Sequence, residues 1–268
     1  MDIHRGMLIL RLQILYRICA RQLGHDFTIL AHNSSTKRTS PFVLSFMMFS
    51  SADMMYSEAI KLNNHGVALL SKGHFEDARH SFRDALDVIK SLLLASKDNF
   101  DYQQQDGLSV GFQWSINAPH YFADINSFVF GRALIIVSSS GYSNHGYPEE
   151  STAIIYNIAL GHHLLALERN CSSLMSKALK FYDIAKEIRK RKKESTKLEG
   201  EKLVDAAILN NVGQICIESF DYDNARRCFD QLSDRLLSLN RSGFLEANDC
   251  EGFMLNLLLE EPSLAAAA

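Results

Sequence analysis

The sequence predicts a mainly all-α protein built from repeated helical hairpins, with a small β-hairpin insertion. The chain has 268 residues, of which 47% are hydrophobic and 22% charged, so it is long enough to bury an ordinary globular core. Only four prolines and fourteen glycines occur, and this composition favours helices over a turn-rich β sandwich. In addition, one order of large, small and aromatic residues recurs three times along the chain.

Two copies of this order match closely, and a third is interrupted. The first copy, in residues 51–92, contains Leu62, Gly66, Leu69, Gly73, Phe75, Ala78, Phe82 and Ala85. The last, in residues 203–240, contains Leu209, Gly213, Cys216, Asp221, Tyr222, Ala225, Phe229 and Leu232 at the same offsets. The middle copy, in residues 151–202, keeps Tyr156, Leu160 and His163, then Ala178, Tyr182 and Ala185, with extra residues at the turn and an extended second helix. Each copy therefore predicts a helix–turn–helix unit.

The interruption within each copy predicts a corner between two packed helices. Gly66 and Gly213 are small where one helix must lie close to the next, which compensates for the poor helix propensity of glycine. Gly73 can end a helix in the left-handed conformation, and Phe75 then anchors the turn. In the last copy, we expect Asp221 to cap the second helix and Tyr222 to act as the anchor.

These residues resemble the tetratricopeptide repeat family, and the stretch around Asn210 and Asn211 is similar to the kinesin-light-chain type of repeat. The resemblance implies an α–α superhelix, right-handed, in which the first helix of each pair lines a concave, peptide-binding groove. It also implies a non-catalytic protein-interaction module.

Asparagines recur on the face that the resemblance places in the groove. Asn63, Asn157 and Asn210 occupy the same place in the first helix of each copy, and Asn64 and Asn211 directly follow two of them. An asparagine amide can pair with both the N–H and the C=O of an extended peptide. We take these five residues and Gln214 as candidate peptide-binding residues. The alternative is that the asparagines bond to the adjacent repeat or to water.

The expected partner is a protein or peptide segment that is uncharged or partly apolar, because the corresponding helix faces carry no Lys or Arg to clamp a carboxylate. The formal net charge of −3 argues against nucleic acid as a partner. One basic run, residues 189–197, could be a nuclear-localisation or nucleic-acid patch, but nearby glutamates favour the solvated end of a helix.

Residues 93–150 lie between the first two copies and predict an insertion with a β-hairpin or two-stranded flap, and a loop. Its two apolar stretches, "LSVGFQWSI" and "SFVFGRALIIVS", place Phe112, Trp114, Phe128, Phe130 and Ile135 on one expected face. An isolated hairpin is marginal in water, so we expect it to lean on the repeats. Residues 241–268 predict a capping helix, with Phe253, Leu255, Leu258 and Leu259 as its apolar residues, and a tail.

No sequence pattern indicates catalysis, so the chain is not expected to be an enzyme or to hold a metal or cofactor. His162 and His163 are adjacent and point to different faces of a helix, which favours surface and packing roles over a metal site. The five cysteines have irregular spacings, which favours free, buried thiols in a reducing compartment.

The sequence leaves alternatives open for the cellular location and for the function of the chain. Residues 1–50 form a basic leader with six Lys/Arg and two Asp/Glu, either poorly ordered or a mitochondrial or plastid targeting segment. Without targeting, the chain is expected in the cytoplasm, and no run is apolar enough for a membrane span. Other possible functions are a structural protein that forms homo-oligomers through the apolar insertion, or an organelle-imported regulatory scaffold.

Overall fold

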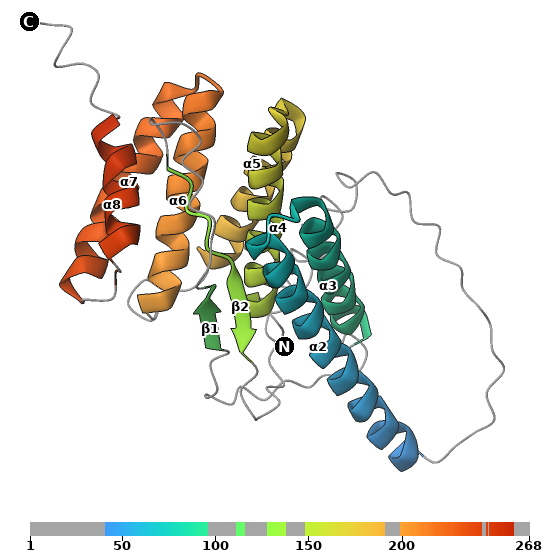
Figure 1. Cartoon of the computed structure of the whole chain (residues 1–268). Helices are drawn as coiled ribbons and strands as arrows, with labels where there is room; N and C mark the ends of the chain where they lie inside the picture. Colours follow the sequence, from blue (N-terminus) through green and yellow to red (C-terminus); the bar gives the residue numbers. More distant parts are fainter. Residues whose placement is uncertain are drawn as a thin grey trace, which may run out of the picture.

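The computed structural model describes residues 41–95, 111–115, 128–137, 148–190, 199–242, 245 and 247–259. Helices make up 84% of this described part, which confirms the mainly all-α prediction. Three antiparallel pairs follow one another: α2 (Pro41–Ser71) with α3 (Phe75–Ala95), α4 (Pro148–Arg169) with α5 (Ser172–Arg189), and α6 (Glu199–Glu218) with α7 (Tyr222–Arg241). A single helix, α8 (Ala247–Leu259), completes the row (Figure 1).

In two of the three pairs, α2–α3 and α6–α7, the helices meet where a glycine faces an aromatic ring, as the repeat pattern predicts. A Cβ atom built on Gly66 would lie 2.5 Å from the Phe82 ring, and one built on Gly213 would lie 2.7 Å from the Phe229 ring. Both rings are fully buried. The small residue of the first helix thus makes room for the aromatic residue of the second.

This packing predicts opposite effects for two Gly→Ala substitutions. We expect Gly213→Ala to lower the free energy of unfolding by about 1 kcal/mol, because overpacking against the buried ring outweighs the gain in helix propensity. Gly161→Ala should raise the free energy of unfolding by about 1 kcal/mol. The added Cβ would lie 3.8 Å from its nearest neighbour, which is an ordinary contact, so only the gain in helix propensity remains. Urea denaturation of both variants measures the difference. Equal stabilisation of the two would contradict the close packing at Gly213.

The three corners share a left-handed residue but differ in chemistry. Gly73 (φ 80°), Asn170 (φ 47°) and Phe220 (φ 60°) occupy the turns after α2, α4 and α6. Asp221 caps α7 by accepting a hydrogen bond from the Asn224 amide, as predicted. Phe75 is the buried anchor that we expected, whereas Tyr222 is not an anchor: it is 61% exposed and meets Phe220 edge-on at the surface.

Phe220 is a bulky residue in a backbone conformation that suits glycine. Because its side chain is 79% exposed, little packing is lost when it is removed. We therefore expect Phe220→Gly to raise the free energy of unfolding by about 1 kcal/mol. Thermal denaturation checks this, with Asn170→Gly as the matched control that changes little, because asparagine tolerates the left-handed region. A less stable Phe220→Gly variant would refute the expectation.

Helix α4 lies at the centre of the molecule and is buried on every side over residues 150–166. His162 and His163 are therefore both fully buried. Their expected packing role is confirmed, and the expected surface role is wrong. The two residues do point to different faces, but both faces are covered: His162 stacks on Phe181, and His163 meets Tyr182 edge-on.

The insertion contains the predicted two-stranded element, with β1 (Gly111–Trp114) antiparallel to β2 (Leu134–Val137) and Trp114 opposite Leu134. It is not a flap on the outside of the repeats. Residues 128–137, which we call the threaded segment, run in extended form between the helices (Figure 1). Ile135 does not share a face with Phe128 and Phe130, because side chains alternate along an extended chain. Leu134 and Ile136 take that place and are buried.

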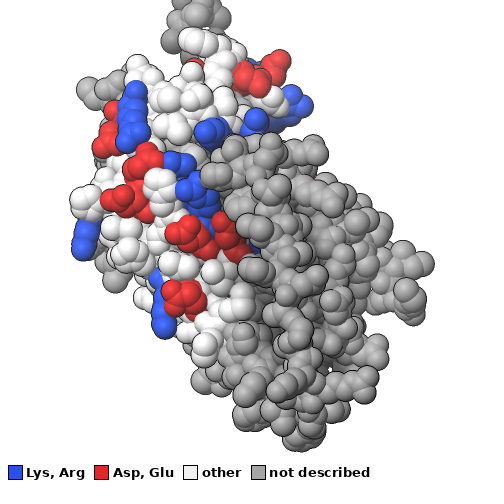
Figure 2. All heavy atoms as spheres, turned by 90° about the vertical axis from the view of Figure 1, so that its right-hand side faces the viewer, with Lys and Arg blue, Asp and Glu red and all other residues white. Residues whose placement is uncertain are grey.

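The prediction that the basic run lies at a solvated helix end is wrong for its first residue. Arg189 is not a solvated helix end: it is buried, pairs with Asp205 and donates to the Glu201 carbonyl. Residues 1–40, 191–198 and 260–268, including most of the leader and of the basic run, lie outside the described residues. On the described part of the face in Figure 2, acidic and basic side chains are interspersed. No helix in the described ranges combines the length and apolarity needed to cross a membrane.

Candidate functional site: an asparagine ladder

Four helices contact the threaded segment, and asparagine side chains make most of the hydrogen bonds. We call α2, α4, α6 and α8 the inner helices. The asparagine ladder consists of Asn63, Asn64, Asn157, Asn210, Asn211 and Asn256. Residues Phe128 and Phe130 of the segment meet α8 and α6, and Leu134 and Ile136 meet α4 and α2. The segment therefore runs in the direction opposite to the order of the helices.

The first clamp of the ladder holds Leu134 and Ile136. Asn157 accepts from the Leu134 N–H (2.8 Å) and donates to its C=O (2.8 Å), and Asn63 donates to the same C=O (3.0 Å). Asn64 accepts from the Ile136 N–H (3.0 Å) and donates to its C=O (3.0 Å). Asn63 also joins its neighbours, because it accepts from Asn157 and donates to Asn64.

The second clamp repeats this arrangement on Phe128 and Phe130. Asn256 accepts from the Phe128 N–H (2.9 Å) and donates to its C=O (2.7 Å), while Asn210 donates to the same C=O (3.0 Å). Asn211 accepts from the Phe130 N–H (2.9 Å) and donates to its C=O (3.1 Å). Asn210 accepts from Asn256 and donates to Asn211, as Asn63 does in the first clamp.

The two clamps use the same edge of the extended chain. Successive residues of a strand point their N–H and C=O groups to opposite edges, so Phe128, Phe130, Leu134 and Ile136 present theirs to the ladder. The opposite edge faces β1, where Ser115 donates to the Ala133 C=O and its hydroxyl accepts from the Ala133 N–H. Because these hydrogen bonds involve only the backbone of the segment, they place little demand on its side chains.

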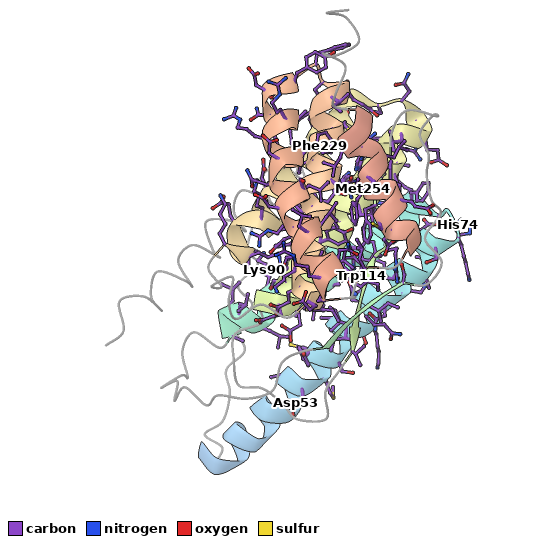
Figure 3. The ribbon with its side chains drawn as sticks, turned by 90° about the vertical axis from the view of Figure 1, so that its left-hand side faces the viewer. Asp53, His74, Lys90, Trp114, Phe229 and Met254 are labelled. Atoms are coloured by element: carbon purple, nitrogen blue, oxygen red, sulfur yellow. The ribbon has the colours of Figure 1, made fainter. Side chains whose placement is uncertain are left out.

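Between the clamps, polar side chains hold Arg132. Its carbonyl accepts from the Tyr156 hydroxyl (3.1 Å), and its guanidinium pairs with Asp249 of α8 (2.7 Å) and donates to the Ser115 carbonyl. The side chains of Arg132 and Asp249 are 12% and 3% exposed, so this ion pair is largely removed from water. Trp114, the last residue of β1 and labelled in Figure 3, packs edge-on against both Phe130 and Tyr156.

Five of the six residues selected from the sequence contact the segment or each other in the ladder. Gln214 lies one turn further along α6, where it is buried and donates to Glu218. The asparagines bond to the adjacent helix pair, which was the alternative to peptide binding, and also to an extended backbone. Binding of a partner peptide by these residues stays a prediction. The extended backbone belongs to the same chain.

The sequence reasoning missed Asn256, Asp249, Arg132 and Tyr156. Asn256 shares one sequence feature with the other ladder positions: a Leu-Asn pair occurs at Leu62–Asn63, Leu209–Asn210 and Leu255–Asn256. The feature is not specific, because a fourth pair, Leu239–Asn240, lies in α7 and takes no part in the ladder. Asn256 also departs from the repeat pattern, because a leucine, not a small residue, lies three positions after it. Helix α8 therefore supplies ladder contacts as well as an end cap.

Two buried histidines of α4 and a buried cysteine of α6 favour their neutral forms, unlike the ion-paired Arg132 and Asp249. Burial lowers the pKa of His162 and of His163 to about 3 each, because the charged imidazolium would lose its hydration; Arg79 and Lys177 lower the His162 value further. Burial raises the pKa of the Cys216 thiol to about 11, which makes it a poor nucleophile. Within the described ranges, no three His, Cys, Asp or Glu side chains come together as a metal site.

Comparisons with protein-family models, with curated proteins and with solved structures gave no match to this chain.

Proposed function

We propose that the chain is a tetratricopeptide-like repeat protein that acts as a non-catalytic protein-interaction module. Its inner helices recognise an extended peptide, and the threaded segment occupies their groove until a partner segment replaces it. The observation that carries this proposal is the asparagine ladder. It satisfies both backbone groups of four residues through side chains of the helices, as a receptor does for a bound peptide. The four cysteines of the described residues are free thiols, which favours a reducing compartment such as the cytoplasm. Cys216 and Cys228 are buried as expected, whereas Cys171 and Cys250 are partly exposed.

A structural role is the second candidate, and the burial of the segment favours it. Phe128, Phe130 and Ile136 are each 1% exposed, so the segment is packed like an internal strand. If it never leaves, partners would have to use other surfaces. The same burial weighs against homo-oligomers formed through the insertion, because these apolar side chains are covered within their own chain.

An exchange assay separates the two candidates. Protease sites are introduced into residues 116–127 and 138–147 of the full chain, so that cleavage leaves the threaded segment held without covalent links. A fluorescent peptide with the sequence of residues 126–138 is then added, and its uptake is followed by anisotropy. The proposal expects saturable uptake with release of the original segment. No uptake by a cleaved chain that stays folded would favour the structural candidate.

Backbone methylation of the peptide provides the matched control. An N-methyl group at Phe130 removes a donor to Asn211, so we expect uptake to weaken at least tenfold. An N-methyl group at Val129 changes the opposite edge of the peptide and should weaken uptake less. Equal effects would argue against recognition through the ladder.

A further inference from the structure

The clamps explain how a backbone is held, and the side chains of the threaded segment indicate which sequences fit. Five alternate residues, Phe128, Phe130, Arg132, Leu134 and Ile136, point to one side of the extended chain. Four of them are apolar and at most 1% exposed, and the fifth forms the ion pair with Asp249. The ladder bonds involve only backbone atoms, so side-chain selectivity must arise from the buried side chains of the segment. On the other side of the segment the buried residues Val129 and Ala133 are small, whereas these five include the large and charged side chains.

The first two positions lie in an aromatic pocket formed by α8 and β1. The Phe130 ring stacks on Phe253 with ring centres 5.1 Å apart and meets Trp114 edge-on. The Phe128 ring lies over Gly252, where an added Cβ would come within 2.3 Å of it. An aliphatic residue would lose the stacking, and a residue larger than glycine at position 252 would fill the space that the ring occupies.

At the central position, Arg132 pairs with a carboxylate that is largely removed from water. Asp249 is 3% exposed, so its carboxylate has little access to water and needs a cation or donors from the protein. Arg132 uses one guanidinium nitrogen for Asp249 and another for the Ser115 carbonyl. Lysine, with a single nitrogen, cannot occupy both sites at these positions. A partner with an arginine at this position departs from the uncharged or partly apolar partner expected from the sequence.

We infer that the partner of the inner helices is an extended peptide with alternating aromatic, aromatic, arginine, aliphatic and aliphatic residues, in which Asp249 selects the arginine. This inference rests on the proposed function. It adds a sequence preference that the backbone clamps alone do not provide. The threaded segment itself is the internal copy of this pattern.

The test uses the cleaved full chain and peptides of residues 126–138 that differ at one position. Relative to the parent peptide, we expect uptake to weaken about 30-fold for Arg132→Gln and at least tenfold for Phe130→Ala. The matched control is Val137→Ser, at a residue that is 45% exposed, and it should bind like the parent. In an Asp249→Asn chain, the preference for the parent peptide over the Arg132→Gln peptide should fall to about twofold or less.

The outcomes separate this inference from the function on which it rests. If the parent peptide enters the groove but the Arg132→Gln peptide binds equally well, the sequence preference is wrong and the interaction module stands. If the Asp249→Asn chain keeps the full preference, Asp249 is not the selecting residue and the inference fails. If the parent peptide does not enter, or if cleavage unfolds the chain, both proposals are overturned. Circular dichroism of the cleaved chain distinguishes the last two cases.

Discussion

Replacing Asn211 by leucine should destabilise the protein by about 4 kcal/mol, because it leaves both backbone groups of Phe130 buried without their ladder partner. Each buried group that loses its hydrogen bond costs about 1–3 kcal/mol, and leucine is too apolar to compensate. The free energy of unfolding of an ordinary domain is about 5–15 kcal/mol, so this single change removes a large fraction of the stability. Urea denaturation followed by circular dichroism measures the loss.

Two matched variants make this prediction specific. Asn240→Leu makes the same chemical change at an exposed position of α7 and should shift the stability by no more than about 0.5 kcal/mol. Asn64→Leu acts at the half-buried end of the ladder, where water can replace the lost bonds, so its effect should be intermediate. If Asn211→Leu proves as mild as Asn240→Leu, the ladder does not hold the segment. Should Asn211→Leu fail to fold, Asn64→Leu still provides the comparison with Asn240→Leu.

Mild acid should destabilise the protein through its two buried histidines. Their pKa values are about 3 in the folded state and near 6.5 when the chain unfolds. Between these values the unfolded chain binds more protons than the folded one, so stability falls as the pH falls from about 6.5 towards 3. Each pH unit in this window costs about 1.4 kcal/mol per histidine, which gives about 4 kcal/mol for both at pH 5.

Substitution of one histidine isolates this effect from other titrations. Burial raises the pKa of Glu150, which acts in the opposite direction and is common to all variants. We expect His162→Leu to remove about half of the stability loss between pH 7.5 and pH 5, measured by urea denaturation at each pH. His74→Gln, at an exposed position, is the matched substitution of a histidine that is not buried. Parallel profiles for His162→Leu and the parent chain would rule out His162 as a source of the acid sensitivity.

The sequence predicted the elements whose causes are local. The Gly66 and Gly213 positions, the Asp221 cap and the apolar spacing of each helix pair depend on residues a few turns apart, and all appear as expected. The path of the insertion could not be predicted in this way. Hydrogen bonds such as Asn256 to Phe128 join residues 128 positions apart, and no local pattern specifies which of the apolar stretches will lie against the inner helices.

The asparagines show that the type of contact could be predicted from the sequence, but not which segment of chain makes it. Their recurrence predicted side chains able to bind an extended backbone, and the helix periodicity placed them on one face. Neither observation says whether that backbone comes from another molecule.

Tyr222 shows that equivalent positions in a repeat pattern can differ in burial. The repeat pattern makes Tyr222 equivalent to Phe75, but Tyr222 is exposed and Phe75 is buried.

The threaded segment also changes how this array should unfold. Repeat proteins with contacts only between neighbouring units can lose their terminal units one at a time. Here one strand touches α2 at Ile136 and α8 at Phe128, so the two ends of the row are coupled through a single short stretch of chain. Fraying of either end breaks a clamp and loosens the other, which favours cooperative unfolding of the whole row. During synthesis the segment also precedes the helices of its second clamp, so that clamp can close only after Asn256 has been made.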